Sequence, residues 1–223
     1  MLLATLLAAQ SFAFEPATNQ AGAERVWEVM PVHWRYDDAD RPDDLDEHDA
    51  HAAIAAAFSE WNAVPGAKVR FIEADAGVPT DQVNVVHWKP KWTHGDDVLA
   101  LTSTWTEETG EILQFRIAIN ALDPQWSTDG DGDAMDLQNV LTHEVGHAVG
   151  LAHDPDHSEA TMAPTARRGE VRKRDLHRSD QDGARYLYPD TSAVPSGCSA
   201  SAAWTPLAVF PALILLLSRR RRS

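Results

Sequence analysis

Residues 143–153 read HEVGHAVGLAH and continue a run whose apolar side chains recur at helical spacing. We expect a helix over 137–149 that begins at Asp136 as its N-cap. Its apolar residues occupy one arc, so the helix is expected to bury that side and to present its histidines on the other. Because His143 and His147 are four residues apart, they lie about 40° apart around the helix axis. Both imidazoles can therefore converge on one cation, as zinc ligands do.

A third ligand cannot continue at helical spacing, because the helix would carry it away from the metal. Gly150 is placed to end the helix in a left-handed conformation, so that the chain turns back and His153 completes the site. Three histidines with one open position are typical of catalytic zinc, whereas structural zinc normally has four protein ligands. Glu144 lies beside the open position and is expected to take a proton from zinc-bound water. The sequence thus predicts a hydrolytic zinc centre with one Zn²⁺ ion.

The rest of the chain predicts strands before this helix and a short helix after it. Helical spacing favours a first helix over 46–62 and a last one from Ser179, as its N-cap, to about Leu187. Strands followed by the functional helix indicate an α+β fold, with a mixed sheet packed against helices. Alternating or apolar runs predict strands at 26–36, 69–73, 82–88, 99–105 and 112–120.

Both ends of the chain differ from its middle. Residues 1–13 are a short apolar run that ends in small residues, which predicts a signal peptide; a buried N-terminal strand is the alternative. Residues 199–218 are long enough to cross a bilayer, and four arginines follow them, as on the cytoplasmic side of a membrane helix. We therefore expect a catalytic domain over 14–190, a linker over 191–198 and a membrane-spanning tail over 199–223.

Composition limits the partners. At 223 residues the chain is long enough for one domain with a real core. Its formal net charge of -15 argues against nucleic acid as a partner, because phosphate binding needs clustered Lys and Arg. Cys198 is the only cysteine, so no intrachain disulfide can form. We expect a secreted or cell-surface protein that contacts the membrane through its C-terminal tail; the oligomeric state stays open.

The histidine pattern resembles the zinc signature of the metzincins, and among them of the matrixins and their bacterial relatives. Met162, in the run Thr161-Met162-Ala163-Pro164, matches their Met-turn, a hydrophobic floor beneath the metal. The resemblance extends over residues 26–188, and the matrixin C-terminal helix pattern is matched by Leu176, Asp180, Gly183, Leu187 and Tyr188.

This resemblance implies a zincin-like, metzincin fold: a twisted mixed five-stranded sheet, an active-site helix and a C-terminal helix. It also implies a zinc-dependent endopeptidase that hydrolyses peptide bonds of extracellular proteins. Residues 99–104 resemble the edge strand along which these enzymes bind an extended peptide, a sequence-tolerant mode because its hydrogen bonds go to backbone.

Some positions depart from the family. Asp154 stands where vertebrate matrixins carry Ser, and Ala166 replaces a Tyr of their specificity pocket, so substrate preference does not carry over. His94-Gly95-Asp96 resembles the start of a structural-zinc loop, but Leu101 stands where a further His is expected, which favours a solvated His94. The Cys198 region, the apolar span and the arginines resemble C-terminal sorting tails of myxobacterial surface proteins, in which the Cys marks a processing or lipid-attachment point.

Two alternatives stay open. Residues 129–133 read DGDGD but fail as an EF-hand, because Ala134 and Val140 replace the turn Gly and the bidentate Glu; another Ca²⁺ site or a solvated acidic loop remains. The second functional hypothesis is a zinc-bearing surface binding or adhesion module without catalysis. Glu144 favours the enzyme, because such a module has no need of a carboxylate beside the open metal position.

Overall fold

The computed structural model describes residues 14–75, 84–95 and 97–193, and residues 14–192 of these belong to one compact unit. Its centre is a five-stranded sheet in the order β2-β1-β3-β5-β4. All neighbouring strands are parallel except β4, which runs antiparallel to β5 at one edge. The strands are β1 (Val32–Asp37), β2 (Phe71–Glu73), β3 (Asn84–Lys89), β4 (Ala100–Thr106) and β5 (Ile112–Asn120), with a separate pair, β6 (Trp126–Ser127) and β7 (Met135–Asp136).

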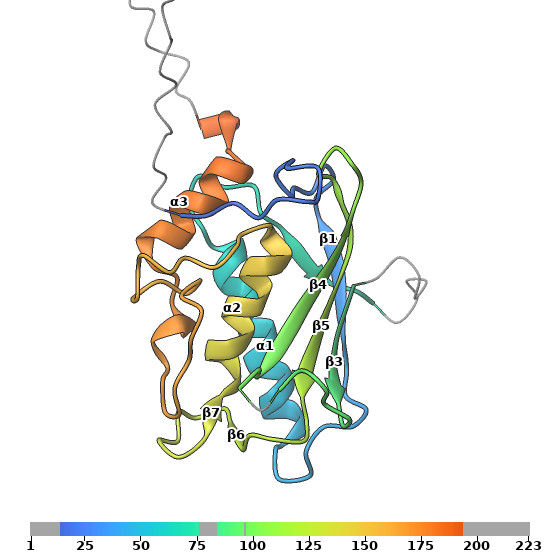
Figure 1. Cartoon of the computed structure of the whole chain (residues 1–223), viewed down its shortest axis with the longest axis vertical. Coiled ribbons are helices and arrows are strands. Elements are labelled where there is room, and N and C mark those ends of the chain that lie inside the picture. The colour runs from blue at the N-terminus through green and yellow to red at the C-terminus, as the bar shows by residue number, and fades with distance from the viewer. Residues whose placement is uncertain (1–13, 76–83, 96, 194–223) are drawn as a thin grey trace, which may run out of the picture. The chain divides into compact units, whose positions relative to one another are not determined.

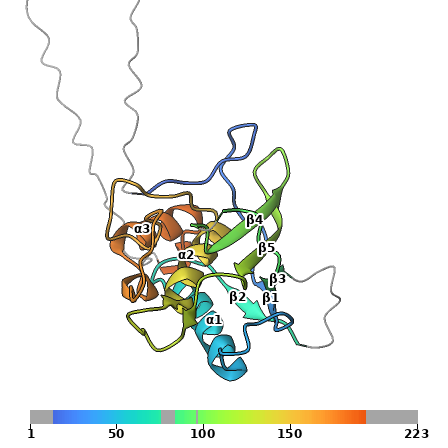
Figure 2. The same cartoon turned by 60° about the horizontal axis from the view of Figure 1, so that its bottom comes forward.

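Helices α1 (Glu47–Asn62) and α2 (Leu137–Val149) lie side by side on one face of the sheet, and α3 (Arg178–Leu187) lies beyond α2 (Figures 1 and 2). Short 3-10 turns, η2 (Arg172–Arg174) and η3 (Thr191–Ala193), complete the set. The expected α+β fold, with its mixed five-stranded sheet, active-site helix and C-terminal helix, is confirmed.

The core between sheet and helices is aromatic. The rings of Trp34 on β1 and Phe58 on α1 stack with centroids 4.0 Å apart, and Phe115 on β5 lies within 6.1 Å of Phe58. Trp61 of α1 is fully buried and donates its indole N–H to the Thr142 carbonyl of α2 at 2.9 Å. These contacts, made by side chains that remove large apolar areas from water, fix α2 against α1 and the sheet.

The prediction for the first strand was wrong at its start. The strand begins at Val32, not at residue 26, because the preceding segment pairs elsewhere. Val26 N–H donates to the Gly110 carbonyl at 3.0 Å, and Ile112 N–H donates to the Val26 carbonyl at 2.7 Å. Trp27 then turns inward and donates its indole N–H to the Ala148 carbonyl of α2 at 2.8 Å. Alternation alone could not reveal this pairing with a distant hairpin.

The N-cap predicted for α2, Asp136, is confirmed, and Asp46 plays the same part at α1. Asp46 and Asp136 cap α1 and α2 by accepting hydrogen bonds from the backbone N–H groups of Asp49 and Asn139. At α3 the prediction of Ser179 as N-cap was wrong. His177 is the N-cap, because its Nδ1 accepts from Ser179 N–H while Asp180 accepts from His177 N–H. The imidazole thus takes the place of the usual short polar side chain.

The predicted signal peptide at 1–13, the Cys198 end of the linker and the tail at 199–223 lie outside the described residues. Among the helices that are described, none combines the length and apolarity needed to cross a membrane.

Candidate metal centre

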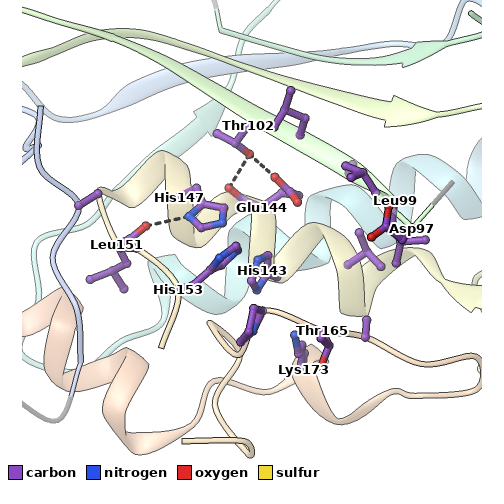
Figure 3. Close-up of a pocket in the computed structure, with 18 of the residues that line it drawn as sticks. Asp97, Leu99, Thr102, His143, Glu144, His147, Leu151, His153, Thr165 and Lys173 are labelled. Atoms are coloured by element: carbon purple, nitrogen blue, oxygen red, sulfur yellow. Dashed lines mark hydrogen bonds between the residues drawn. The ribbon is translucent and has the colours of Figure 1, made fainter. Parts of the chain in front are cut away.

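Helix α2 and the turn that follows it bring three imidazoles together. His143 and His147 lie one turn apart on α2, and His153 returns to them after the helix ends (Figure 3). One ring nitrogen from each of the three lies within 4.8 Å of the others. The ring centroids are 4.8 to 5.2 Å apart. Such a triangle of nitrogens fits a single zinc ion, which takes imidazole ligands at about 2.0 Å.

The return of the chain depends on Gly150. Its φ of +111° is left-handed, as predicted, and Leu151 N–H donates to the Gly146 carbonyl at 3.0 Å across the turn. A Cβ at Gly150 would lie 2.2 Å from the carbonyl oxygen of Arg25. Both the backbone conformation and the close approach of the N-terminal segment therefore require glycine.

Hydrogen bonds set the tautomers of the two helical histidines. The Nδ1 atom of His143 lies 2.7 Å from the Thr161 carbonyl, and that of His147 lies 2.8 Å from the Leu151 carbonyl. Since a carbonyl can only accept, both Nδ1 atoms carry the proton and donate it. The lone pair on each Nε2 is left for a metal, the arrangement typical of histidine ligands.

Burial also keeps these rings neutral. It lowers the pKa of His143 well below its usual value, with His147 adding to the effect, and it lowers the pKa of His147 and of His153. Neutral imidazole is the form that binds a metal. The residues present therefore fit a zinc ion in charge state as well as in position.

Glu144 follows the first histidine and is buried, with 6% of its surface exposed. Burial raises its pKa to about 7, against a lowering by the hydrogen bond from Thr102. The Thr102 hydroxyl lies 2.6 Å from Oε2 of Glu144 and 2.9 Å from the Glu144 carbonyl (Figure 3). Thr102 sits on β4, so the edge strand itself holds the carboxylate. Thr102 was not identified from the sequence. The feature that could have indicated it is a hydroxyl side chain within the predicted edge strand, on the face that turns toward the helix.

Met162 packs beneath the histidine helix. It is 2% exposed, and a Cβ at Gly146 would lie 2.2 Å from its sulfur. Asp180 of α3 fixes this turn by accepting hydrogen bonds from the N–H groups of Thr161 at 2.8 Å and Met162 at 3.1 Å. The missing side chain at Gly146 therefore lets Met162 and Trp61 pack closely against α2.

The side of α2 that carries the histidines is itself largely covered. His143 is only 8% exposed, because β4 and the chain around Thr161 cover the side of α2 opposite the core. Of the three histidines, His147 is partly exposed and His153 is exposed. The site is thus a partly closed cleft and not a surface patch.

The cleft encloses about 1120 Å³, more than the roughly 300 to 1,000 Å³ of small-molecule pockets, so it has room for a chain segment. Residues 99–102 form one wall, residues 164–166 form another, and Lys173 lines the cleft near Thr165 (Figure 3). Ala166, noted above as a departure from the family, belongs to this second wall.

Other polar groups lie apart from this centre. His94 is exposed, with its Nε2 3.5 Å from the Lys89 ammonium. The 129–133 loop is bonded within itself, since Asp131 and Asp133 N–H groups donate to Asp129 and Asp131. An exposed group of Asp46, His48 and Asp49 also lies within ligand distance, which sequence reasoning did not identify.

Comparison with known proteins agrees with this centre. The family model described as matrixin matches residues 26–189. Human matrix metalloproteinase-19 is 29% identical over 158 residues, which is 69% of this chain and 28% of that protein. Metalloendoproteinase 1 of Glycine max is 31% identical over 61% of this chain and 45% of that protein. Metalloendoproteinase 2-MMP of Arabidopsis thaliana is 41% identical over 73 residues, 30% of this chain and 19% of that protein.

The chain spans less than half the length of each of these relatives. The family match nevertheless covers most of the chain and includes α2, the turn at Met162 and α3. The chain therefore belongs to the matrixin family, whose members bind a catalytic zinc ion, and His143, His147 and His153 form its candidate zinc site.

Proposed function

We propose that this protein is a zinc-dependent endopeptidase that cleaves extracellular proteins, with His143, His147 and His153 as metal ligands and Glu144 as general base. The observation that carries the proposal is the position of Glu144. Its carboxylate lines the same cleft as the three histidines and is held there by Thr102. A metal site that served only structure would have no need of this carboxylate.

The chain's own residues account for proton movement. A bound zinc ion would lower the pKa of coordinated water and polarise the carbonyl of the scissile bond. Glu144 takes the proton from the attacking water and delivers it to the amine that leaves. The hydrogen bond from Thr102 restricts the carboxylate to one orientation, so that its second oxygen stays available to the proton. Gly150 and Met162 support the site without taking part in the reaction. Gly150 turns the chain so that His153 reaches the other two histidines, and Met162 packs beneath α2.

Strand β4 is suited to hold the substrate backbone. It is the last strand of the sheet, and no strand of the described residues pairs with its outer side. Residues 97–102, which include the start of β4, line the cleft along this edge. A peptide added to such an edge gains hydrogen bonds to backbone whatever its sequence. An extended segment of a protein is therefore the proposed substrate.

The proposed location is outside the cell, either free or attached to the surface. Support comes from the sequence at both ends: the signal peptide predicted at 1–13, and the span at 199–218 followed by arginines. The catalytic domain would then cover residues 14–190. Mass spectrometry of the mature protein should find a new N-terminus near Phe14, and it should determine whether the chain is cut or lipidated at Cys198.

Metal removal tests the activity. We expect the protein to cut denatured casein at internal bonds, to stop when a zinc-selective chelator is added, and to recover when one equivalent of Zn²⁺ is returned. Calcium kept constant throughout separates this effect from any calcium dependence of folding. Cleavage that persists without zinc would contradict the proposal. Zinc binding without cleavage of casein or of a broad peptide library would favour the adhesion module instead.

A further inference from the structure

A buried lysine lines the same cleft as the candidate metal centre. Lys173 is 2% exposed and belongs to η2, the short turn on the far side of the cleft from β4. Figure 3 shows it below His143, beside Thr165. Its ammonium donates to the Ala163 carbonyl, the residue that follows Met162. The side chain thus lies in the wall of the cleft and close to the metal ligands.

Its two neighbours in sequence show what is unusual about it. Arg172 pairs with Glu159 at 2.7 Å and with Glu170 at 3.1 Å. Arg174 pairs with the buried Asp136 at 2.5 Å. Lys173 is more buried than either, yet no carboxylate of the described residues lies within ion-pair distance of it. Burial lowers the pKa of Lys173, against a raising by the more distant carboxylates of Glu170, Asp180 and Glu144.

The ammonium of Lys173 also has hydrogen-bond donors that the described residues do not use. An ammonium has three hydrogens, and one carbonyl accepts from it here. Asn139 of α2, 1% exposed, uses Oδ1 to accept from Lys173 N–H at 2.7 Å, while its Nδ2 has no partner in the described part of the chain. Asn139 does not itself line the cleft, whereas Lys173 does. Because buried donors without acceptors are costly, the ammonium of Lys173 is suited to a ligand that brings acceptors.

We propose that Lys173 makes the enzyme selective for a carboxylate beside the scissile bond, that of a Glu or Asp side chain of the substrate. This inference rests on the proposed endopeptidase function and concerns the same cleft. A carboxylate is the ligand that supplies both the missing negative charge and the missing acceptors. The preference for a carboxylate is expected at this position of the cleft alone, because the protein as a whole carries a formal charge of -15 and repels acidic chains elsewhere.

Two kinds of carboxylate could occupy the position, the acidic side chain proposed here and the C-terminus of a peptide. Matched peptides separate them. One pair carries Glu or Gln on either side of the cleaved bond within a chain whose ends are blocked. The peptides of the second pair end one residue after the cleaved bond. One has a free C-terminal carboxylate and the other an amidated C-terminus.

The parent enzyme should cleave the blocked Glu peptide about tenfold or more faster than the blocked Gln peptide, judged by kcat/KM, since a charged hydrogen bond is being tested. Lys173→Met should reduce that ratio to near one. Arg168→Met is the matched control: Arg168 also lines the cleft, but it is exposed and donates to the Asp133 carbonyl, so the ratio should change by less than about twofold.

The outcomes are distinguishable. Absence of cleavage of every peptide and of casein by the zinc-loaded parent would overturn the proposed function. Cleavage by the parent with equal rates for Glu and Gln would overturn the role of Lys173 alone, whatever the variant does. If the parent prefers the peptide with a free C-terminus but cleaves the blocked Glu and Gln peptides equally fast, the ligand of Lys173 is the chain end. That result would overturn the proposal of an acidic side chain. Because the parent's ratio decides these cases, a poorly folding Lys173→Met variant leaves the test intact.

Discussion

The two walls of the cleft are built in different ways. The histidine wall consists of His143, Glu144 and His147 on α2 with Thr102 on β4, and its polar groups have partners in the protein. The lysine wall consists of residues 164–166 and Lys173, and it holds a buried cation without a carboxylate within ion-pair distance in the described residues. The difference indicates a division of roles. The first wall is complete for binding a metal and moving a proton, whereas the second needs the substrate to complete it.

The largest expected effect comes from breaking the histidine wall. His147→Ala removes one of three ligands, so we expect zinc content to fall close to zero and casein cleavage to be lost. Metal analysis after dialysis, together with the cleavage rate, measures both. His51→Ala, at a histidine of α1 that pairs with Glu73 and belongs to neither group of possible ligands, is the control and should keep both parental values. Full zinc retention in His147→Ala would show that this histidine is not a ligand.

The second prediction concerns stability and the residue that follows Lys173. Arg174 donates to both carboxylate oxygens of Asp136, at 2.8 and 2.5 Å, and Asp136 is fully buried at the start of α2. Arg174→Met leaves this charge unpaired and should lower the free energy of unfolding by about 3 to 5 kcal/mol. Urea unfolding followed by circular dichroism measures it.

The neighbouring arginine provides the comparison. Arg172 forms two ion pairs, but its partner Glu159 is largely exposed. Arg172→Met should therefore lower the free energy of unfolding by no more than about 1 kcal/mol. Equal losses for the two substitutions would contradict the importance given to the burial of Asp136.

The smallest expected effect on catalysis concerns Thr102. Thr102→Val keeps the shape of the side chain and removes the hydroxyl that orients Glu144. We expect kcat to fall about tenfold, the value of one hydrogen bond to a charged group, with KM and zinc content much less changed. Thr102→Ser should restore most of kcat, because the hydroxyl returns. A rise in KM at constant kcat would show instead that Thr102 acts on substrate binding.

The same contrast explains what could be predicted from the sequence. Helix α2 was predicted to the residue, because its cap, its apolar spacing and the turn at Gly150 are local signals. Thr102 and Lys173 were missed, because each matters only through contacts with residues distant in the chain. The start of β1 was wrong for the same reason, since Val26 pairs with Gly110 and Ile112. The cap of α3 was misplaced because an imidazole took a role that sequence rules assign to Ser.

Glu144 is the residue on which the account depends most, and Glu144→Gln tests it directly. The amide keeps the size of the side chain but cannot take the proton. With one zinc bound in both proteins, kcat/KM for an internally cleaved peptide should be lower in the variant by about a thousandfold. A zinc-loaded variant that cleaves at the parental rate would contradict the assignment of Glu144 as the general base.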